Sequence, residues 1–212
     1  MERSHENILY TGKGCGSAIA ECVLALAGIP FRHIEVDYAE PGPGRDELLK
    51  LNPFGQIPTM VLADGKVLTE TVAITMFAQA HKRDLPLVPP LESSDIPQFW
   101  RYLMLLSTSV YPTYTYGDDP KKWVAGEKAI GELKASTDRH REKLWLYIDR
   151  GFHGPYFLGE NFSVLDIFIT VMSHWRPGRK WFHDNCPRLA SVSARVEAFP
   201  ELKEILERNF AE

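Results

Sequence analysis

Apolar positions in the first eighty residues alternate between the spacing of strands and the spacing of helices. Short apolar runs at residues 7–11 and 31–37 predict two strands, the first of them buried. Between them, apolar residues recur at helical spacing from Ser17 to Ala27, and Gly28 stands where such a helix would end. A shorter helix is predicted over residues 45–51. Strand, helix, strand and helix in this order indicate an α/β unit.

A β-hairpin is predicted directly after this unit. Two apolar runs, Thr59–Leu62 and Lys66–Leu68, flank the dipeptide Asp64-Gly65. Asp-Gly is favoured in two-residue hairpin loops because both turn positions need a positive φ. Pro58 cannot donate a hydrogen bond to a neighbouring strand, so it marks the beginning or an edge of its strand. The hairpin extends the α/β unit to a mixed sheet.

Two dipeptides beside the hairpin have the chemistry to bind a peptide-like ligand. The Ile57-Pro58 bond could be cis, since X–Pro bonds lose most of the trans preference, and the Ile57 amide and carbonyl would then face outward to pair with an extended peptide. Glu70-Thr71 begins a helical pattern. A hydroxyl with exposed backbone amides at a helix start is suited to a carboxylate.

The pattern becomes purely helical in the second half of the chain. Residues 82–94 contain three prolines, which disfavour regular structure, and they predict a linker. Helical spacing then covers residues 96–110 and 123–149, and a tyrosine-rich break is expected between them. No strand pattern appears beyond the linker. We therefore expect a second part that is all-helical.

Residues 161–166 carry the sharpest signal of this half. Ser163 can cap the amide of Asp166, and the Asp166 carboxylate can reach back to the Ser163 amide, which is a reciprocal capping box. The helix that it opens, through Trp175, is apolar almost all round and should be buried. Residues 187–210 predict one or two final helical segments.

Composition and charge argue against several classes of protein. The 212 residues are 44% hydrophobic and 25% charged, as in an ordinary globular chain. A net charge of -4 offers no electrostatic footprint for nucleic acid or for an anionic membrane. No apolar run approaches the roughly 20 residues of a membrane span, and no signal peptide is expected. Three cysteines without metal-type spacing indicate reduced thiols, a cytoplasmic protein and no bound metal.

Together, these motifs resemble the cytosolic glutathione transferases. Asn-Pro-x-Gly-x-Ile-Pro, the hairpin and Glu-Thr-x-Ala-Ile are similar to the N-terminal, thioredoxin-like domain of that family. Gly159 followed by the capping box is similar to a motif of its helical domain. The resemblance covers nearly the whole chain. It implies an α/β thioredoxin-like domain over residues 1–81, a linker over 82–94 and an all-α domain over 95–212.

The resemblance also implies that glutathione binds as a co-substrate. Members of the family carry a cis proline after a residue whose backbone pairs with the cysteinyl unit of glutathione, and a Glu-Ser pair that holds the γ-glutamyl end. Ile57 and Pro58 match the first element. Glu70 and Thr71 match the second, and Thr71 keeps the hydroxyl of the usual serine.

The group that stabilises the glutathione thiolate is expected in the turn after the first strand, where the sequence departs from the family. Counted back from Gly28 without a gap, Tyr10 falls where the tyrosine-type classes keep their catalytic tyrosine. Gly14 falls where zeta-like serine and omega-like cysteine enzymes keep theirs, and Gly16 falls where the beta-class cysteine would lie. A shift of one residue in the turn would restore Cys15 to such a position.

Three side chains therefore stay open as the catalytic group. Cys15 could be a low-pKa thiolate that forms mixed disulfides with glutathione, or an unreactive side chain in a glycine turn. Ser17 could donate to a thiolate, although a serine before a helix is more often an N-cap. Tyr10 could be the donor or a packing residue of the strand.

The resemblance implies a homodimeric detoxification enzyme that adds glutathione to a small hydrophobic electrophile. Tyr111 and Tyr114 are candidates for the wall of the electrophile site, since aromatic side chains commonly line sites for apolar ligands. A Cys-dependent thiol transferase or isomerase is an alternative within the same class. A non-catalytic binding or regulatory protein is an alternative from another class, and the fold alone does not decide between them.

Overall fold

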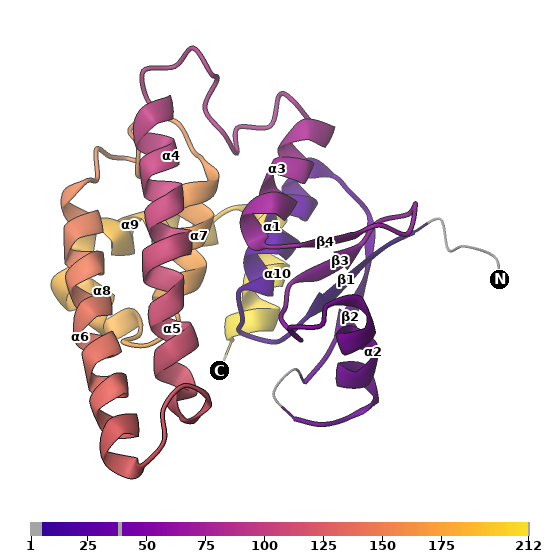
Figure 1. Ribbon diagram of the computed structural model, residues 1–212. Coiled ribbons are helices and arrows are strands. Elements are labelled where there is room, and N and C mark those ends of the chain that lie inside the picture. The colour runs from indigo at the N-terminus through magenta and orange to yellow at the C-terminus, as the bar shows by residue number, and fades with distance from the viewer. Residues whose placement is uncertain (1–5, 38–39, 212) are drawn as a thin grey trace. The chain divides into compact units, whose positions relative to one another are not determined.

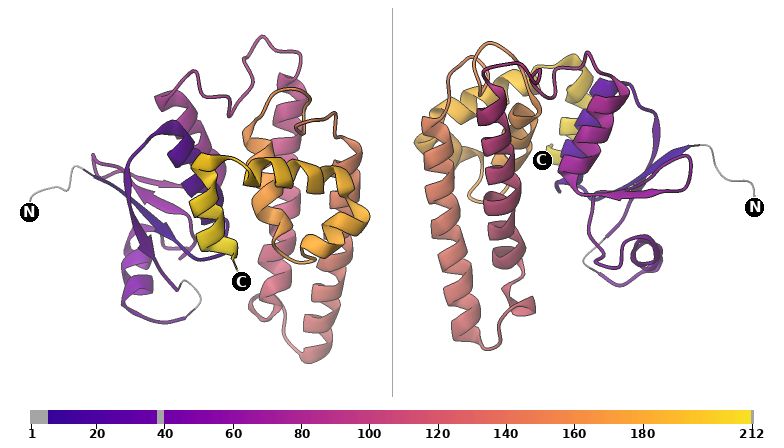
Figure 2. Two further views of the ribbon diagram at one scale, coloured as in Figure 1. Left: turned by 180° about the vertical axis from the view of Figure 1, so that it is seen from behind. Right: turned by 45° about the horizontal axis from the view of Figure 1, so that its top comes forward.

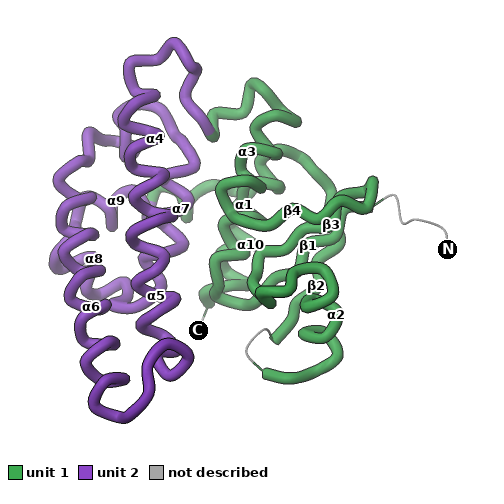
Figure 3. The backbone as a smooth tube through the Cα atoms, viewed as in Figure 1, with its two compact units in different colours: residues 1–87, 195–212 green, residues 88–194 purple. Residues whose placement is uncertain are grey.

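The computed structural model describes residues 6–37 and 40–211, and it divides into two compact units (Figure 3). Unit 1 comprises residues 1–87 together with residues 195–212, and unit 2 comprises residues 88–194. The C-terminal segment, which the resemblance assigns to the helical domain, is thus grouped with the N-terminal unit. The expected domain boundary at residues 94 and 95 stays a prediction.

Unit 1 is built on one mixed sheet with the strand order β2-β1-β3-β4. Its strands are β1 (Asn7–Thr11), β2 (Phe31–Glu35), β3 (Thr59–Val61) and β4 (Val67–Thr69). Strands β1 and β2 are parallel, whereas β3 runs antiparallel to both β1 and β4. This arrangement confirms the expected thioredoxin-like α/β unit and a hairpin around Asp64-Gly65. The two-residue turn is wrong, because the Leu62 N–H donates to the Lys66 carbonyl and leaves residues 63–65 as the loop, in which Gly65 has a positive φ of 86° and Asp64 does not.

Helices cover both faces of this sheet. They are α1 (Ser17–Ala27), α2 (Pro43–Leu51), α3 (Thr71–His81) and α10 (Pro200–Phe210). Figure 1 shows α1, α3 and α10 on one face and α2 on the other. On the α2 face, Tyr10 and Val36 pack with Leu48 in a small apolar core. The left view of Figure 2 shows α10 lying along α1, which brings a segment near residue 209 back to the beginning of the chain.

Unit 2 is all-helical in its described elements. They are α4 (Ile96–Leu105), a π-helical turn (Leu106–Val110), α5 (Tyr111–Asp118), a 3-10 turn (Pro120–Lys122), α6 (Glu127–Arg150), α7 (Val164–Ser173), α8 (Arg179–Asn185) and the larger part of α9 (Pro187–Glu197). All ten residues of α7 are buried, and the predicted capping box at its start is present. All five tryptophans of the chain belong to this unit: Trp100, Trp123, Trp145, Trp175 and Trp181.

The expected tyrosine-rich break after residue 110 is wrong. The segment continues as helix α5 through Asp118. Pro112 directly follows the π-helical turn Leu106–Val110, which joins α4 to α5 without a break, and tyrosine and threonine are only mildly unfavourable in helices. The following helix begins at Glu127 rather than Trp123, after Gly126 with its φ of 87°.

Among the residues that the structure describes, no helix is both long enough and apolar enough to cross a membrane.

Candidate functional site

The register of the sheet brings three sequence motifs to one end of the strands. Thr59, the first residue of β3, pairs with Tyr10 near the end of β1 and with Thr69 at the end of β4. The turn after β1, the Ile57-Pro58 dipeptide before β3 and the Glu70-Thr71 dipeptide after β4 therefore all lie at the same end of the strands. Strand pairing thus brings together residues that lie up to about sixty positions apart in the sequence.

The loop before β3 is held by Asn52, a buried side chain that sequence reasoning did not single out. The Asn52 side-chain amide donates to the Gln56 carbonyl and to the Thr59 hydroxyl, both at 3.1 Å, and its oxygen accepts from the Phe54 N–H at 3.1 Å. The Thr59 hydroxyl in turn donates to the Gln56 carbonyl at 2.8 Å. The loop therefore presents Ile57 from a cross-linked support.

The Ile57-Pro58 peptide bond is cis, which agrees with the sequence-based suggestion. The Ile57 side chain packs against the apolar core on the α2 face. Within the described part of the chain, the Ile57 backbone N–H and C=O take no part in a hydrogen bond. This donor and acceptor are available to pair with an extended peptide.

Glu70 and Thr71 form the start of α3 with an unusual backbone. Glu70 has φ 67° and ψ 121°, and it is the single non-glycine residue with a positive φ in the part of the chain that the structure describes. Such a conformation costs on the order of 1–3 kcal/mol and persists where the surroundings impose it. The first amides of α3 point out of the helix start, because helices leave their first N–H groups without an intrahelical acceptor. These amides, with the Thr71 hydroxyl, suit a carboxylate.

The turn after β1 is closed by Ser17. The Gly12 N–H donates to the Ser17 hydroxyl at 3.1 Å, and the Ser17 hydroxyl donates to the Gly12 carbonyl at 3.2 Å. Ser17 is fully buried as the first residue of α1, and Gly16 occupies the N-cap position without a side-chain cap. The expectation that Ser17 is an N-cap is therefore wrong, since its hydroxyl closes the turn. Its single proton is already donated to Gly12.

Cys15 lies in the same turn, two residues before α1. Its side chain is half-buried, and its thiol donates to the Lys13 carbonyl at 3.5 Å. The backbone N–H groups of Gly16 and Ser17 have no acceptor among the residues that the structure describes. A helix start with unused amides favours an anionic sulfur.

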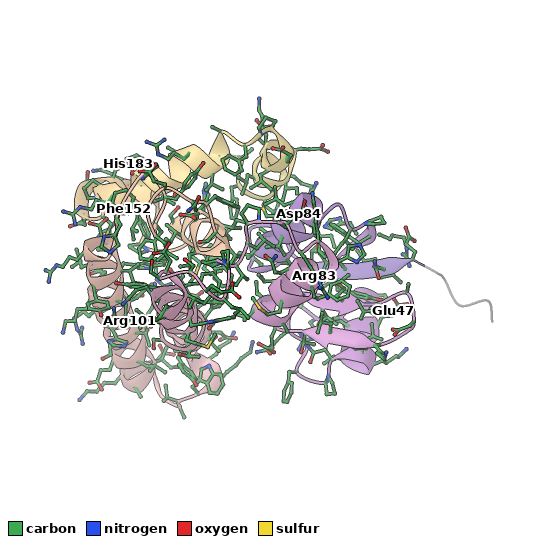
Figure 4. The ribbon with its side chains drawn as sticks, turned by 90° about the horizontal axis from the view of Figure 1, so that it is seen from above. Glu47, Arg83, Asp84, Arg101, Phe152 and His183 are labelled. Atoms are coloured by element: carbon green, nitrogen blue, oxygen red, sulfur yellow. The ribbon has the colours of Figure 1, made fainter. Side chains whose placement is uncertain are left out.

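Tyr10 is placed in the core on the α2 face of the sheet. Only 6% of its surface is exposed, and burial raises the pKa of its phenol, with a smaller contribution from the Glu47 carboxylate labelled in Figure 4. Helix α1, which the turn leads into, covers the other face of the sheet (Figure 1). This position suits the packing role that the sequence left open for Tyr10.

Tyr111 and Tyr114 both belong to the aromatic packing of unit 2. The Tyr111 ring lies edge-on to Phe168 and Trp175. Tyr114 is 6% exposed, and the guanidinium carbon of Arg141 lies 4.1 Å from the centroid of its ring. Burial raises the pKa of Tyr114 to about 12. Tyr114 therefore offers little surface to a ligand in this structure.

Sequence reasoning also missed a contact between this turn and the C-terminal helix. The Gly14 N–H donates to Oδ1 of Asn209 at 3.1 Å. The two residues are 195 positions apart, and no local motif could have linked them. Asn52, in contrast, had a usable signal, because it precedes the Pro-x-Gly segment and lies seven residues before the Thr59 hydroxyl.

Of the residues that the structure describes, no group of three or more His, Cys, Asp or Glu side chains could hold a metal ion. Within this part of the chain, Cys15, Cys22 and Cys186 form no disulfide.

Known proteins are similar to this chain in sequence and in fold. The family model for the glutathione S-transferase N-terminal domain matches residues 18–81. The uncharacterized GST-like protein YncG of Escherichia coli K12 is 34% identical over 203 residues, covering 95% of this chain and 97% of YncG. A glutathione transferase homolog from Sulfitobacter, solved with bound glutathione, has a TM-score of 0.85 at 20% identity and covers 97% of this chain and 99% of its own. A sphingomonad glutathione S-transferase complexed with glutathione has a TM-score of 0.76 at 22% identity, with coverages of 97% and 100%.

Proposed function

Because this chain belongs to the glutathione S-transferase family, we propose that it binds glutathione and stabilises its thiolate for attack on a small hydrophobic electrophile. The observation that carries the proposal is the sheet register, which brings the unpaired Ile57 backbone and the start of α3 to one end of the strands. A cytoplasmic detoxification role is part of the same proposal.

Glutathione would bind in an extended conformation at this end of the strands. The N–H and C=O of its cysteinyl unit pair with the backbone of Ile57, next to the cis Pro58. Its γ-glutamyl carboxylate accepts from the amides and the hydroxyl at Thr71, where the helix dipole favours an anion. The Glu70 carboxylate is then available to pair with the γ-glutamyl ammonium group.

The turn after β1 would receive the sulfur. The thiol loses its proton to solvent, and the unused amides of Gly16 and Ser17 donate to the thiolate, with Cys15 beside them in the same turn. Each unit by which the thiol pKa falls corresponds to about 1.4 kcal/mol of preferential stabilisation of the thiolate. The thiolate then attacks the electrophilic carbon, and the leaving group departs with its electron pair.

A thiol transferase is the second candidate, favoured by the partial exposure of Cys15. The Cys15 thiolate would attack the glutathione sulfur of a mixed disulfide and release the other partner as a thiolate. A second glutathione would reduce the Cys15–glutathione disulfide and leave as oxidised glutathione. If Cys15→Ser abolishes disulfide reduction and leaves conjugation of an aryl halide intact, thiol transfer is a separate Cys15-dependent activity. Ser17→Ala and Tyr10→Phe are measured in parallel as the other candidate donors.

Calorimetric titration of the reduced protein with glutathione tests the proposed site. Glu70→Ala should weaken binding by about tenfold or more, equivalent to about 1.4 kcal/mol, because it removes the partner of the ammonium group. Glu132→Ala is the matched control, since it removes the same charge from an exposed position of α6. Absence of binding to the wild-type protein would overturn the enzyme proposal in favour of a non-catalytic binding protein.

We also propose that the protein forms a homodimer through Phe54. This ring is 84% exposed in the loop that carries Ile57, although phenylalanine side chains are usually buried. A second copy of the chain would cover it. Sedimentation equilibrium of Phe54→Glu should show monomers at concentrations where the wild-type protein is dimeric, and a wild-type protein that is monomeric throughout would refute this arrangement.

A further inference from the structure

We propose that Asn209, in the last turn of α10, is a positioning residue for the turn that receives the glutathione sulfur. The inference rests on the proposed function, and it concerns how the chain holds the turn rather than which group touches the sulfur. Its starting point is the hydrogen bond from the Gly14 N–H to Oδ1 of Asn209 at 3.1 Å, between two segments of unit 1.

Both ends of the Asn209 side chain are in use. Its Oδ1 accepts from Gly14, and its Nδ2 donates to Oε1 of Glu21 at 3.3 Å and to the Ile205 carbonyl at 3.0 Å. A backbone carbonyl can only accept a hydrogen bond and a backbone N–H can only donate one, so Ile205 and Gly14 fix which end of the amide faces Gly14. With 6% of its surface exposed, Asn209 is shielded from competing water.

Glu21 anchors this arrangement from inside α1. Its carboxylate is 1% exposed, and a buried carboxylate is costly unless it is paired. The Arg208 guanidinium forms an ion pair with it, and Nε2 of His33 on β2 lies 4.0 Å away. The His33 ring also hydrogen-bonds to the hydroxyl of Thr11, the last residue of β1. Arg208 and Asn209 of α10 therefore contact Glu21 of α1 directly, and Glu21 is linked to β1 through His33.

The turn needs such support because it is rich in glycine. Gly12, Gly14 and Gly16 lie within five residues, and glycine loses more conformational freedom on folding than any other residue. Gly14 adopts a φ of 72°, and an added Cβ there would lie 3.5 Å from the Asn209 carbonyl oxygen. Donors to a developing anion act well only if they are held in place beforehand. The contact with Asn209 holds Gly14 in place. Gly14 directly precedes Cys15, and the unused amides of Gly16 and Ser17 follow in the same turn.

The test compares Asn209→Ala with Leu202→Ala. Leu202 is a fully buried residue of the same helix, and its truncation weakens the packing of α10 without removing the bond to Gly14. The readouts are the exchange rate of the Gly14 amide by NMR, the thiol pKa of bound glutathione from thiolate absorbance, and the affinity for S-methylglutathione, which has no thiol.

In Asn209→Ala, the Gly14 amide should exchange at least about tenfold faster than in the wild-type protein, because its acceptor is lost. The thiol pKa of bound glutathione should rise by about one unit, a tenfold loss of thiolate stabilisation. The affinity for S-methylglutathione should change by less than about twofold, because Ile57, Glu70 and Thr71 are untouched. Leu202→Ala should lower the Tm and leave the thiol pKa at its wild-type value.

An unchanged Gly14 exchange rate or an unchanged thiol pKa in Asn209→Ala would overturn the proposal. An equal pKa shift in Leu202→Ala would do the same, because it would reduce Asn209 to a packing role. If the wild-type protein binds no glutathione, the proposed function fails by itself, and the rate of Cys15 alkylation by iodoacetamide becomes the deciding readout. A rate that differs from wild type in Asn209→Ala alone supports positioning, and equal rates overturn it. Asn209→Ser replaces Asn209→Ala if the latter does not fold.

Discussion

The backbone of Glu70 makes a first prediction at the scale of single residues. A side chain at φ 67° is strained, and glycine tolerates positive φ better than any other residue. Glu70→Gly should therefore be more stable than Glu70→Ala by about 1 kcal/mol, although both lose the carboxylate. Urea denaturation of the two variants measures the difference. Equal stabilities would show that the conformation at residue 70 stores no strain.

Asn52 makes a second residue-scale prediction. Asn52→Ala removes the hydrogen bonds that the buried Asn52 side chain makes to Gln56, Thr59 and Phe54, and should cost about 2–3 kcal/mol of unfolding free energy. It should also weaken glutathione binding, because the loop that presents Ile57 loses its support. Asn185→Ala is the control, since that exposed side chain makes one bond to the Trp181 carbonyl. A loss of stability no larger than that of the control would contradict the supporting role.

What the sequence could predict at this scale depended on the distance between partners along the chain. The Ile57-Pro58 and Glu70-Thr71 motifs are local, and the proline itself suggested the cis bond, whereas nothing in a glutamate indicated the positive φ of Glu70. The sequence could not decide whether Tyr10 is a thiolate donor or a packing residue, because it does not show which helix covers the face of β1 that carries Tyr10. Glu21 and Asn209 gave no signal, since their partners are nearly the whole chain apart.

At the scale of elements, the capping box of α7 predicts a pH dependence of stability. Asp166 accepts from the N–H groups of Ser163 and Phe157, both at 2.7 Å, yet burial raises its pKa to about 6. Between about pH 4 and pH 6 the folded chain keeps a proton that the unfolded chain has released. Stability should therefore fall as pH rises through this window, by on the order of 3 kcal/mol.

Asp166→Asn isolates this effect, because the amide resembles the protonated acid and does not titrate. Urea denaturation from pH 4 to pH 7 gives the unfolding free energies of the wild type and of Asp166→Asn. As pH rises, the unfolding free energy of the wild type should fall relative to that of Asp166→Asn. The exposed Asp46→Asn serves as a control whose difference should stay nearly flat. Parallel wild-type and Asp166→Asn curves would mean that Asp166 is ionised throughout.

Elements were predicted well where the apolar period was clear and poorly where it was not. The bounds of β1 and α1 agree with the sequence pattern because both carry dense apolar positions, and glycines stand directly after β1 and on both sides of α1. The α4 to α5 segment was misjudged, because Pro112 and the tyrosines resemble a breaker locally. The π-helical turn at Leu106–Val110 and the packing of Tyr111 against Phe168 and Trp175 keep the chain helical, and neither is written in local propensity.

At the scale of the whole molecule, the division into two units predicts where a defect is felt. Leu202→Ala should cost about 2–5 kcal/mol in the packing of α10, which belongs to unit 1. Hydrogen exchange followed by mass spectrometry should then show weaker protection in α1 and β1 than in α7. Tryptophan fluorescence, which reports on unit 2 alone, should change little under the same native conditions. An equal loss of protection in both units would indicate one cooperative block.

The return of α10 to unit 1 sets an order of events during synthesis. The first 87 residues of unit 1 leave the ribosome before the 107 residues of unit 2, and α10 follows only afterwards. At about 5–20 residues per second, the N-terminal sheet waits roughly 5–20 s for the helix that pairs with Glu21 and Gly14. A nascent chain in that interval has its strands but lacks the partner of its buried carboxylate. It is during this interval that a chaperone would find an incomplete N-terminal unit to bind.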